Sequence, residues 1–260
     1  KGAGYVMTGQ RELSTLEHGH SPEAIQQRIG RPPDRGYLPD AVLGAIDGGV
    51  TTFAVVAGAV GGGLPGVAVI VLGAANLLAD GFSMAASNYL AAKSEREDVE
   101  RIRRQEERHI EQVPEGEREE IRQIFAGKGF SGEMLDQVVA VITANRQVWI
   151  ETMLTEEHGL QLIGRNPLRA GLATFVAFAL VGLLPLLPFL VAPWEVARGF
   201  SISIAITAAA FLGVGLLKGR VLRRSLLGSG IETLLIGGCA AVLAYVAGYA
   251  MRQLYGMVPG

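Results

Sequence analysis

Residues 41–90 decide the fold, and they read AVLGAIDGGVTTFAVVAGAVGGGLPGVAVIVLGAANLLADGFSMAASNYL. Almost every residue in this stretch is apolar or small, and Asp47 and Asp80 are its only charged residues. The hydrocarbon core of a bilayer needs about 20 such residues in a helix, so the stretch is long enough for two membrane spans. The turn between them, residues 61–66, is too short to hold a domain. The two spans are therefore predicted to be antiparallel neighbours.

Further apolar stretches complete the membrane part. We predict five spans: residues 41–61, the residues from the turn to 90, and residues 168–191, 197–217 and 226–249. Most charged residues lie in the remaining segment, 91–167, because a charge left in hydrocarbon costs about 2.5–3.5 kcal/mol. Pro185 and Pro188 predict a kink in the third span. The predicted fold is all-α, a polytopic membrane protein with a cytoplasmic three-helix insert between spans 2 and 3.

The distribution of Lys and Arg predicts the orientation. The loop between spans 4 and 5 contains four basic residues, whereas the loop between spans 1 and 2 contains none and that between spans 3 and 4 has only Arg198 at its edge. Positive residues are retained in the cytoplasm. We therefore expect a cytoplasmic N-terminal tail (1–40), a cytoplasmic insert (91–167) and a non-cytoplasmic C-terminal tail (251–260). Residues 1–40 hold no apolar run that could serve as a signal peptide, and a short helix is expected near 21–29.

The insert is acidic, with sixteen Asp and Glu against eleven Lys and Arg. Pro114 and the glycines at 127 and 129 predict the ends of two helices, and Ser131 is a candidate cap for a third helix that runs to about His158. Three pairs of residues share a helix face by their spacing: Glu106 with His109, Glu117 with Glu120, and Met153 with Glu157.

These three faces would offer carboxylate oxygens, one imidazole and one thioether. Such ligands suit Fe²⁺, Mn²⁺, Co²⁺ or Zn²⁺, and the thioether disfavours Mg²⁺ and Ca²⁺. A second interpretation stays open, in which the carboxylates form ion pairs on a solvated surface. Neighbouring glutamates could make similar pairs, namely Glu107, Glu111, Glu119 and Glu156.

Polar residues inside the spans are the second candidate site. Asp47 lies in span 1, and Asn76, Asp80 and Met84 lie along one stripe of span 2. Intramembrane carboxylates are costly, and one that faces the interior of a bundle is a functional candidate. The two helices could line a polar path. Alternatively, these residues only cap or hydrogen-bond within a packed bundle.

Several classes of function are excluded or disfavoured. The net charge of −2 argues against nucleic acid as a partner, and the single cysteine, Cys239, cannot form a disulfide or thiolate site within the chain. No nucleophile is paired with a base, so we do not expect an enzyme, and nothing indicates a prosthetic group.

The sequence resembles the vacuolar iron transporter family from about residue 38 to the C-terminus. The resemblance rests on the runs DGGVTTFAVVAGA (47–59) and ADGFSMA (79–85), the five spans and the position of the insert. It implies a homodimeric antiporter that exports Fe²⁺, and often Mn²⁺ or related ions, from the cytoplasm in exchange for protons. It also implies that Asp47 and Met84 line the transport path.

The resemblance further implies that the insert binds metal through five of the residues above: Glu106, Glu117, Glu120, Met153 and Glu157. At His109 the family pattern has another glutamate, which alters the expected metal preference and pH response. Paired Glu-x-x-His motifs are absent, so ferroxidase activity is not expected. The short chain favours the plasma (inner) membrane of a bacterium, with a vacuole-like compartment as the alternative.

The sequence leaves two functions open. The chain is either a proton-coupled exporter of divalent metals or a membrane-anchored metal sensor or buffer without transport. Asp47 discriminates between them, because an anchor has no need for an acid inside the membrane.

Overall fold

A computed structural model describes residues 19, 21–29, 36–162, 164–191 and 195–256. These residues form helices and connections, and no strand occurs among them. Residues 1–35 are a separate unit whose described helix is α2 (Pro22–Ile29), at the position where the sequence predicts a short helix. Residues 36–260 form the other unit, which contains the predicted spans and the insert.

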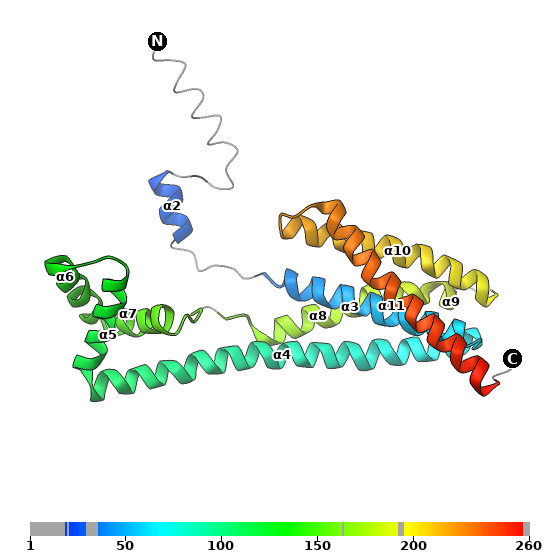
Figure 1. Ribbon diagram of the computed structural model, residues 1–260, viewed down its shortest axis with the longest axis horizontal. Helices are drawn as coiled ribbons and strands as arrows, with labels where there is room; N and C mark the ends of the chain where they lie inside the picture. Colours follow the sequence, from blue (N-terminus) through cyan, green and yellow to red (C-terminus); the bar gives the residue numbers. More distant parts are fainter. Residues whose placement is uncertain (1–18, 20, 30–35, 163, 192–194, 257–260) are drawn as a thin grey trace, which may run out of the picture. The chain divides into compact units, whose positions relative to one another are not determined.

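Five helical segments of this unit are long and apolar enough to cross a membrane, which confirms the predicted number of spans. They are α3 (Leu38–Gly61), α4 (Gly66–Gln112), α8 with its continuation to the end of α9 (Pro167–Val191), α10 (Val196–Val221) and α11 (Leu226–Tyr255). Helix α3 packs against α4, α8, α10 and α11, so it is the central helix of the bundle (Figure 1).

Glycines let α3 approach its neighbours closely. A Cβ atom added at Gly48 would lie 2.3 Å from the carbonyl oxygen of Phe178 in α8. Where α3 contacts α11, a Cβ atom added at Gly248 of α11 would lie 2.0 Å from the carbonyl oxygen of Gly58. Small residues at such crossings allow the backbone-to-backbone packing that holds membrane helices together.

Gly48→Ala is therefore expected to lower the thermal stability of the protein. The added methyl group meets backbone, which cannot rotate away, and overpacking of this kind costs about 1–3 kcal/mol. The matched control is Gly213→Ala on α10, where an added Cβ has no neighbour within 4 Å. Thermal melting in detergent should show a clear loss for Gly48→Ala and almost none for Gly213→Ala. Equal melting temperatures would contradict the packing described here.

The third span is interrupted where its prolines predict a kink. Helix α8 (Pro167–Leu183) ends before a single 3₁₀ turn, Leu184–Leu186, and α9 (Leu187–Val191) follows. Pro185 and Pro188 cannot donate backbone hydrogen bonds, which explains the break. The Ser203 hydroxyl of α10 donates a hydrogen bond of 2.7 Å to the Pro185 carbonyl. The interruption is thus held against a neighbouring helix.

Helix α4 has 47 residues, and at a rise of about 1.5 Å per residue it is roughly 70 Å long. That exceeds the thickness of a bilayer, so the helix continues out of the membrane into the charged segment (Figure 1). Helix α5 (Pro114–Gly127) begins at the proline that the sequence marks as a boundary. A core of Ile121, Leu135, Val139, Trp149 and Met153 holds the insert together.

The predicted third helix of the insert, from Ser131 to His158, is not continuous. It is divided into α6 (Gly132–Thr143), α7 (Arg146–Thr152) and a π-helical turn, Met153–Glu157. The Asn145 side chain accepts hydrogen bonds from the backbone N–H groups of Gln147 and Val148 at 3.0 and 3.3 Å, and it thereby starts a new helix. The prediction of one helix was wrong because this cap was not recognised.

A buried ion pair joins the start of α3 to the connection before α8. Asp40 is 2% exposed and accepts hydrogen bonds from Arg165 at 2.6 Å and from Asn88 of α4 at 2.9 Å. Arg165 also lies 3.4 Å from Glu95 on α4. Helix α3 begins at Leu38, so it starts before residue 40, where the predicted N-terminal tail ends.

Candidate metal centres

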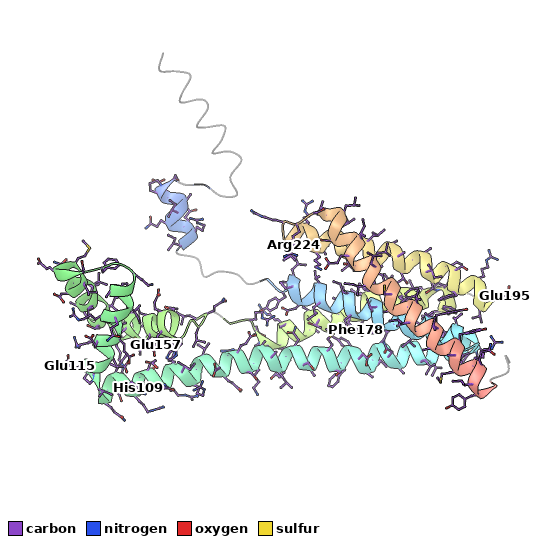
Figure 2. The ribbon with its side chains drawn as sticks, viewed as in Figure 1. His109, Glu115, Glu157, Phe178, Glu195 and Arg224 are labelled. Carbon is purple, nitrogen blue, oxygen red and sulfur yellow. The ribbon has the colours of Figure 1, made fainter. Side chains whose placement is uncertain are left out.

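Three elements converge at the end of α4 to form the first candidate site. The end of α4 supplies Glu106 and His109, α5 supplies Glu117, and the π-helical turn and the residue after it supply Glu157 and His158. Figure 2 shows His109 and Glu157 on neighbouring elements in this region. We call these five residues together with Glu120 the carboxylate cluster.

The cluster contains two groups of potential ligands, each with its ligand atoms within 4.8 Å of one another. In the first group, Glu106, His109 and Glu117, the His109 Nδ1 atom lies 3.3 Å from Glu117 Oε1. In the second group, Glu106, Glu157 and His158, the His158 Nε2 atom lies 3.1 Å from Glu106 Oε1 and 3.5 Å from Glu157 Oε2. Glu106 belongs to both groups and is 1% exposed. It is therefore the residue that the two groups share.

The electrostatics of the carboxylate cluster favour a cation. Burial, followed by the nearby charges of Glu120, Glu106 and Glu157, raises the pKa of Glu117 to about 7. Burial also raises the pKa of Glu157, with Glu120 and Glu106 adding to the effect and His158 and His109 opposing it. The second carboxylate oxygen of Glu117 is buried and has no hydrogen-bond partner among the described residues. A bound divalent ion would relieve this repulsion and satisfy that oxygen.

Five of the six residues that the sequence predicts as ligands thus lie in one electrostatic cluster. The sixth, Met153, is fully buried, and its described contacts are with the apolar core of the insert, including Ile121 and Trp149. Its role as a ligand stays a prediction. The exposed neighbours make surface pairs instead: Glu111 with Arg146, Glu119 with Arg122, and Glu156 with Lys128.

His158 was missed by the sequence analysis. In a regular α-helix the backbone N–H of Glu157 would donate to the Met153 carbonyl, four residues back. Here the His158 N–H donates to that carbonyl instead, at 3.3 Å and five residues back. This wider turn brings the His158 ring to Glu106. The available signal was a histidine directly after a predicted carboxylate ligand and directly before Gly159, which has a φ of +62° and ends the turn.

The second candidate site lies between α3 and α4. The Asn76 amide of α4 donates hydrogen bonds of 3.4 Å to the hydroxyl groups of Thr51 and Thr52 on α3. Thr51 in turn donates to the Asp47 carbonyl at 2.9 Å. The carboxylates of Asp47 and Asp80 lie close enough to interact electrostatically. The acidic residues of the two adjacent spans therefore interact with each other.

Neither of these two carboxylates has a basic partner among the described residues. No described Lys or Arg lies within ion-pair distance of Asp47 or Asp80. Asp47 is half-buried, whereas Asp80 is exposed and Met84, one turn further along α4, is half-buried. Two acids on adjacent apolar helices, neither of which has a described basic partner, are a costly arrangement that a cation or a proton would stabilise.

The family model described as "VIT family" matches residues 38–249. The chain belongs to the VIT family. It is also similar to the vacuolar iron transporter of Toxoplasma gondii, with 32% identity over 263 residues that cover 95% of this chain and 86% of the relative. Vacuolar iron transporter 1 of Oryza sativa subsp. japonica is 31% identical over 250 residues, which cover 94% of each chain.

The relatives are named as iron transporters, which supports metal-ion transport and fits a protein that is not an enzyme. The five apolar helices make this VIT-family chain an integral membrane protein.

The metal-free VIT-family protein should lose thermal stability as the pH rises from about 5 to about 8. Glu117 keeps its proton up to about pH 7 in the folded state, whereas an unfolded glutamate loses it near pH 4.5. The stability that protonated Glu117 contributes is therefore present below pH 4.5 and is lost as the pH rises through 7. Melting curves in a chelator should show this slope, and Glu117→Gln should flatten it. The same slope in the variant would contradict the assignment.

Proposed function

We propose that this protein exports Fe²⁺, with Mn²⁺, Co²⁺ or Zn²⁺ as further substrates, from the cytoplasm in exchange for protons. The observation that carries the proposal is the pair Asp47 and Asp80, two mutually repelling carboxylates on adjacent spans without a described basic partner. A carboxylate can hold either a dehydrated divalent ion or a proton, and this competition couples the two fluxes. An anchor for a sensor domain gains nothing from such a pair.

The neighbouring ligands support a transition metal as the substrate. Asn76 offers an amide oxygen, and Met84 offers a thioether on the same stripe of α4 as Asp80. A thioether adds affinity for Fe²⁺, Co²⁺ or Zn²⁺ but little for Mg²⁺ or Ca²⁺, which prefer oxygen ligands.

The exposure of Asp80 supports a homodimer. Asp80, Ser83 and Ser87 are exposed on the part of α4 that is apolar enough to lie in the membrane. A carboxylate facing lipid is costly, and a second copy of the chain would cover it. We therefore propose that the α4 stripes of two protomers face each other and complete the polar path.

The carboxylate cluster is proposed to collect metal on the cytoplasmic side. The basic residues between α10 and α11 support this orientation, since Lys218, Arg220, Arg223 and Arg224 all lie at that connection. The insert would then lie on the side from which metal is exported. The proposed location is the plasma membrane, although the relatives above are named as vacuolar.

Flux measurements in proteoliposomes test the proposal. The full-length protein is reconstituted with a metal-sensitive dye in the lumen, and Fe²⁺ is added outside under reducing conditions. An acidic lumen should accelerate Fe²⁺ entry, and a protonophore that collapses the pH gradient should slow it to the rate without a gradient. Metal binding by the protein without any flux would favour the anchored sensor or buffer instead.

A further inference from the structure

A cleft of about 970 Å³ lies beside α4, between the end of its apolar part and the connection that leads into α8. Figure 1 shows that connection running next to α4. The cleft includes no residue of the carboxylate cluster and none of the Asp47 and Asp80 pair. It is therefore a third site, separate from the two candidate metal centres.

The lining of this cleft is basic, although the insert as a whole is acidic. Two carboxylates line it, those of Glu97 and Glu100. Five basic side chains line it as well: Lys93, Arg96, Arg103, Arg104 and Arg165. Among the described residues, Arg96, Arg103 and Arg104 have no ion-pair partner. Lys93 lies 3.6 Å from Glu97, but both side chains are largely solvated, so this pair is weak. The cleft should attract anions, which is the opposite of what a metal site requires.

The cleft begins where the apolar part of α4 ends. Its lining includes Tyr89, near the end of the apolar part of α4, and Leu168, which is 71% exposed at the start of α8. At about 1.5 Å per residue, Lys93 and Arg96 lie roughly 6 and 10 Å beyond Tyr89 along α4. The headgroup layer extends about 5–8 Å beyond the hydrocarbon core. Lys93 is thus at the depth of the lipid phosphates, and Arg96 lies just beyond them, where its long side chain can reach back to them. Tyr89 is at the interface that aromatic residues prefer.

We propose that the cleft binds the headgroup of an anionic phospholipid from the leaflet on the side of the insert. Guanidinium groups bind phosphate oxygens in a bidentate manner, and clusters of basic residues directly outside a membrane helix attract anionic lipids. Leu162, Pro167 and Leu168 line the same cleft and offer apolar contacts to the glycerol and the first methylene groups. The bound lipid would join α4 to the connection before α8, beside the Arg165 and Asp40 ion pair.

The test compares two variants with equal changes of charge on one helix. Lys93→Gln with Arg96→Gln removes two exposed basic side chains that line the cleft nearest the membrane. Arg101→Gln with Arg108→Gln removes two exposed arginines of α4 that do not line it. Native mass spectrometry of the full-length protein in detergent measures binding of phosphatidylglycerol, with phosphatidylcholine as the neutral lipid. Melting temperatures of both variants verify that they fold.

The cleft variant should bind phosphatidylglycerol about tenfold more weakly, whereas the control variant should change by less than about twofold. Phosphatidylcholine should bind weakly to all three proteins. Equal losses in the two variants would show general attraction to the charged helix and would overturn the proposal. Full competition by soluble glycerophosphate, at concentrations similar to those of the lipid, would overturn it too, because the occupant would then be a free phosphate. Glycerophosphate that competes only at much higher concentration supports the lipid.

Discussion

Asp47→Asn should reduce metal flux by about 100-fold or more while leaving the protein folded. The substitution keeps the size of the side chain and its hydrogen-bonding capacity, but it removes the charge that holds a dehydrated divalent ion and accepts a proton when the ion leaves. The Asp47 side chain has no hydrogen bond or ion pair to a described residue that the change would break, since Thr51 donates to the backbone carbonyl. Removing a repulsion with Asp80 should even favour folding.

The measurement is Fe²⁺ or Mn²⁺ uptake into proteoliposomes with an acidic lumen. Asp98→Asn is the matched control, because Asp98 is an exposed carboxylate that pairs with Arg101 at 2.6 Å outside the membrane part of α4. Met84→Ala should reduce the rate less than Asp47→Asn, since a neutral thioether contributes to metal preference but carries no proton. A folded Asp47→Asn protein with the rate of the unmodified chain would favour the sensor or buffer function.

The second large effect is expected in the carboxylate cluster. Replacing Glu106, Glu117, Glu120 and Glu157 together by Gln should weaken binding of Mn²⁺ or Co²⁺ by about 100-fold or more. The four substitutions remove the negative charge that the carboxylate cluster concentrates around the buried Glu106, while the side chains keep their size. Without this repulsion the metal-free variant should melt at a higher temperature at pH 8 than the unmodified protein.

The chain itself provides the control for this experiment. Replacing the exposed glutamates Glu111, Glu115, Glu119 and Glu156 by Gln removes the same charge from the same region. Titration calorimetry of both variants as full-length proteins separates specific coordination from general attraction. The control should change the affinity by only a few-fold, because these side chains lie on the surface and each of them pairs with a basic residue. Similar losses in both variants would contradict the assigned ligands.

The spans could be predicted because the bilayer imposes a coarse pattern on the sequence. A stretch of about 20 apolar residues crosses a membrane as a helix, because a helix satisfies every backbone hydrogen bond within the segment. Glycine or proline marks the ends of such a stretch. The shared helix face of Glu106 and His109 could be predicted from their spacing, because residues three or four apart lie on one face. Their meeting with Glu117 was expected only from the family resemblance, and Pro114 marks where α5 begins.

Other features depend on local geometry that spacing does not reveal. The prediction of one helix up to His158 was wrong because Asn145 starts a new helix with its side chain. The π-helical turn then changes which residue lies one turn after Met153, and this change brings His158 to the cluster. The pairing of Asp40 with Arg165 joins residues 125 positions apart, and no local pattern indicates it. The cleft beside α4 forms only when the connection before α8 lies next to that helix.

Exchange of metal for protons is the central claim, and it can be measured without an imposed pH gradient. Proteoliposomes with equal pH on both sides contain one dye for metal and one for pH, and Fe²⁺ or Mn²⁺ is added outside. The account predicts that metal entry makes the lumen alkaline, because each arriving ion drives protons out, and that Asp47→Asn abolishes both signals together. Metal entry without any change of lumenal pH, or no metal entry by a folded protein, would contradict it.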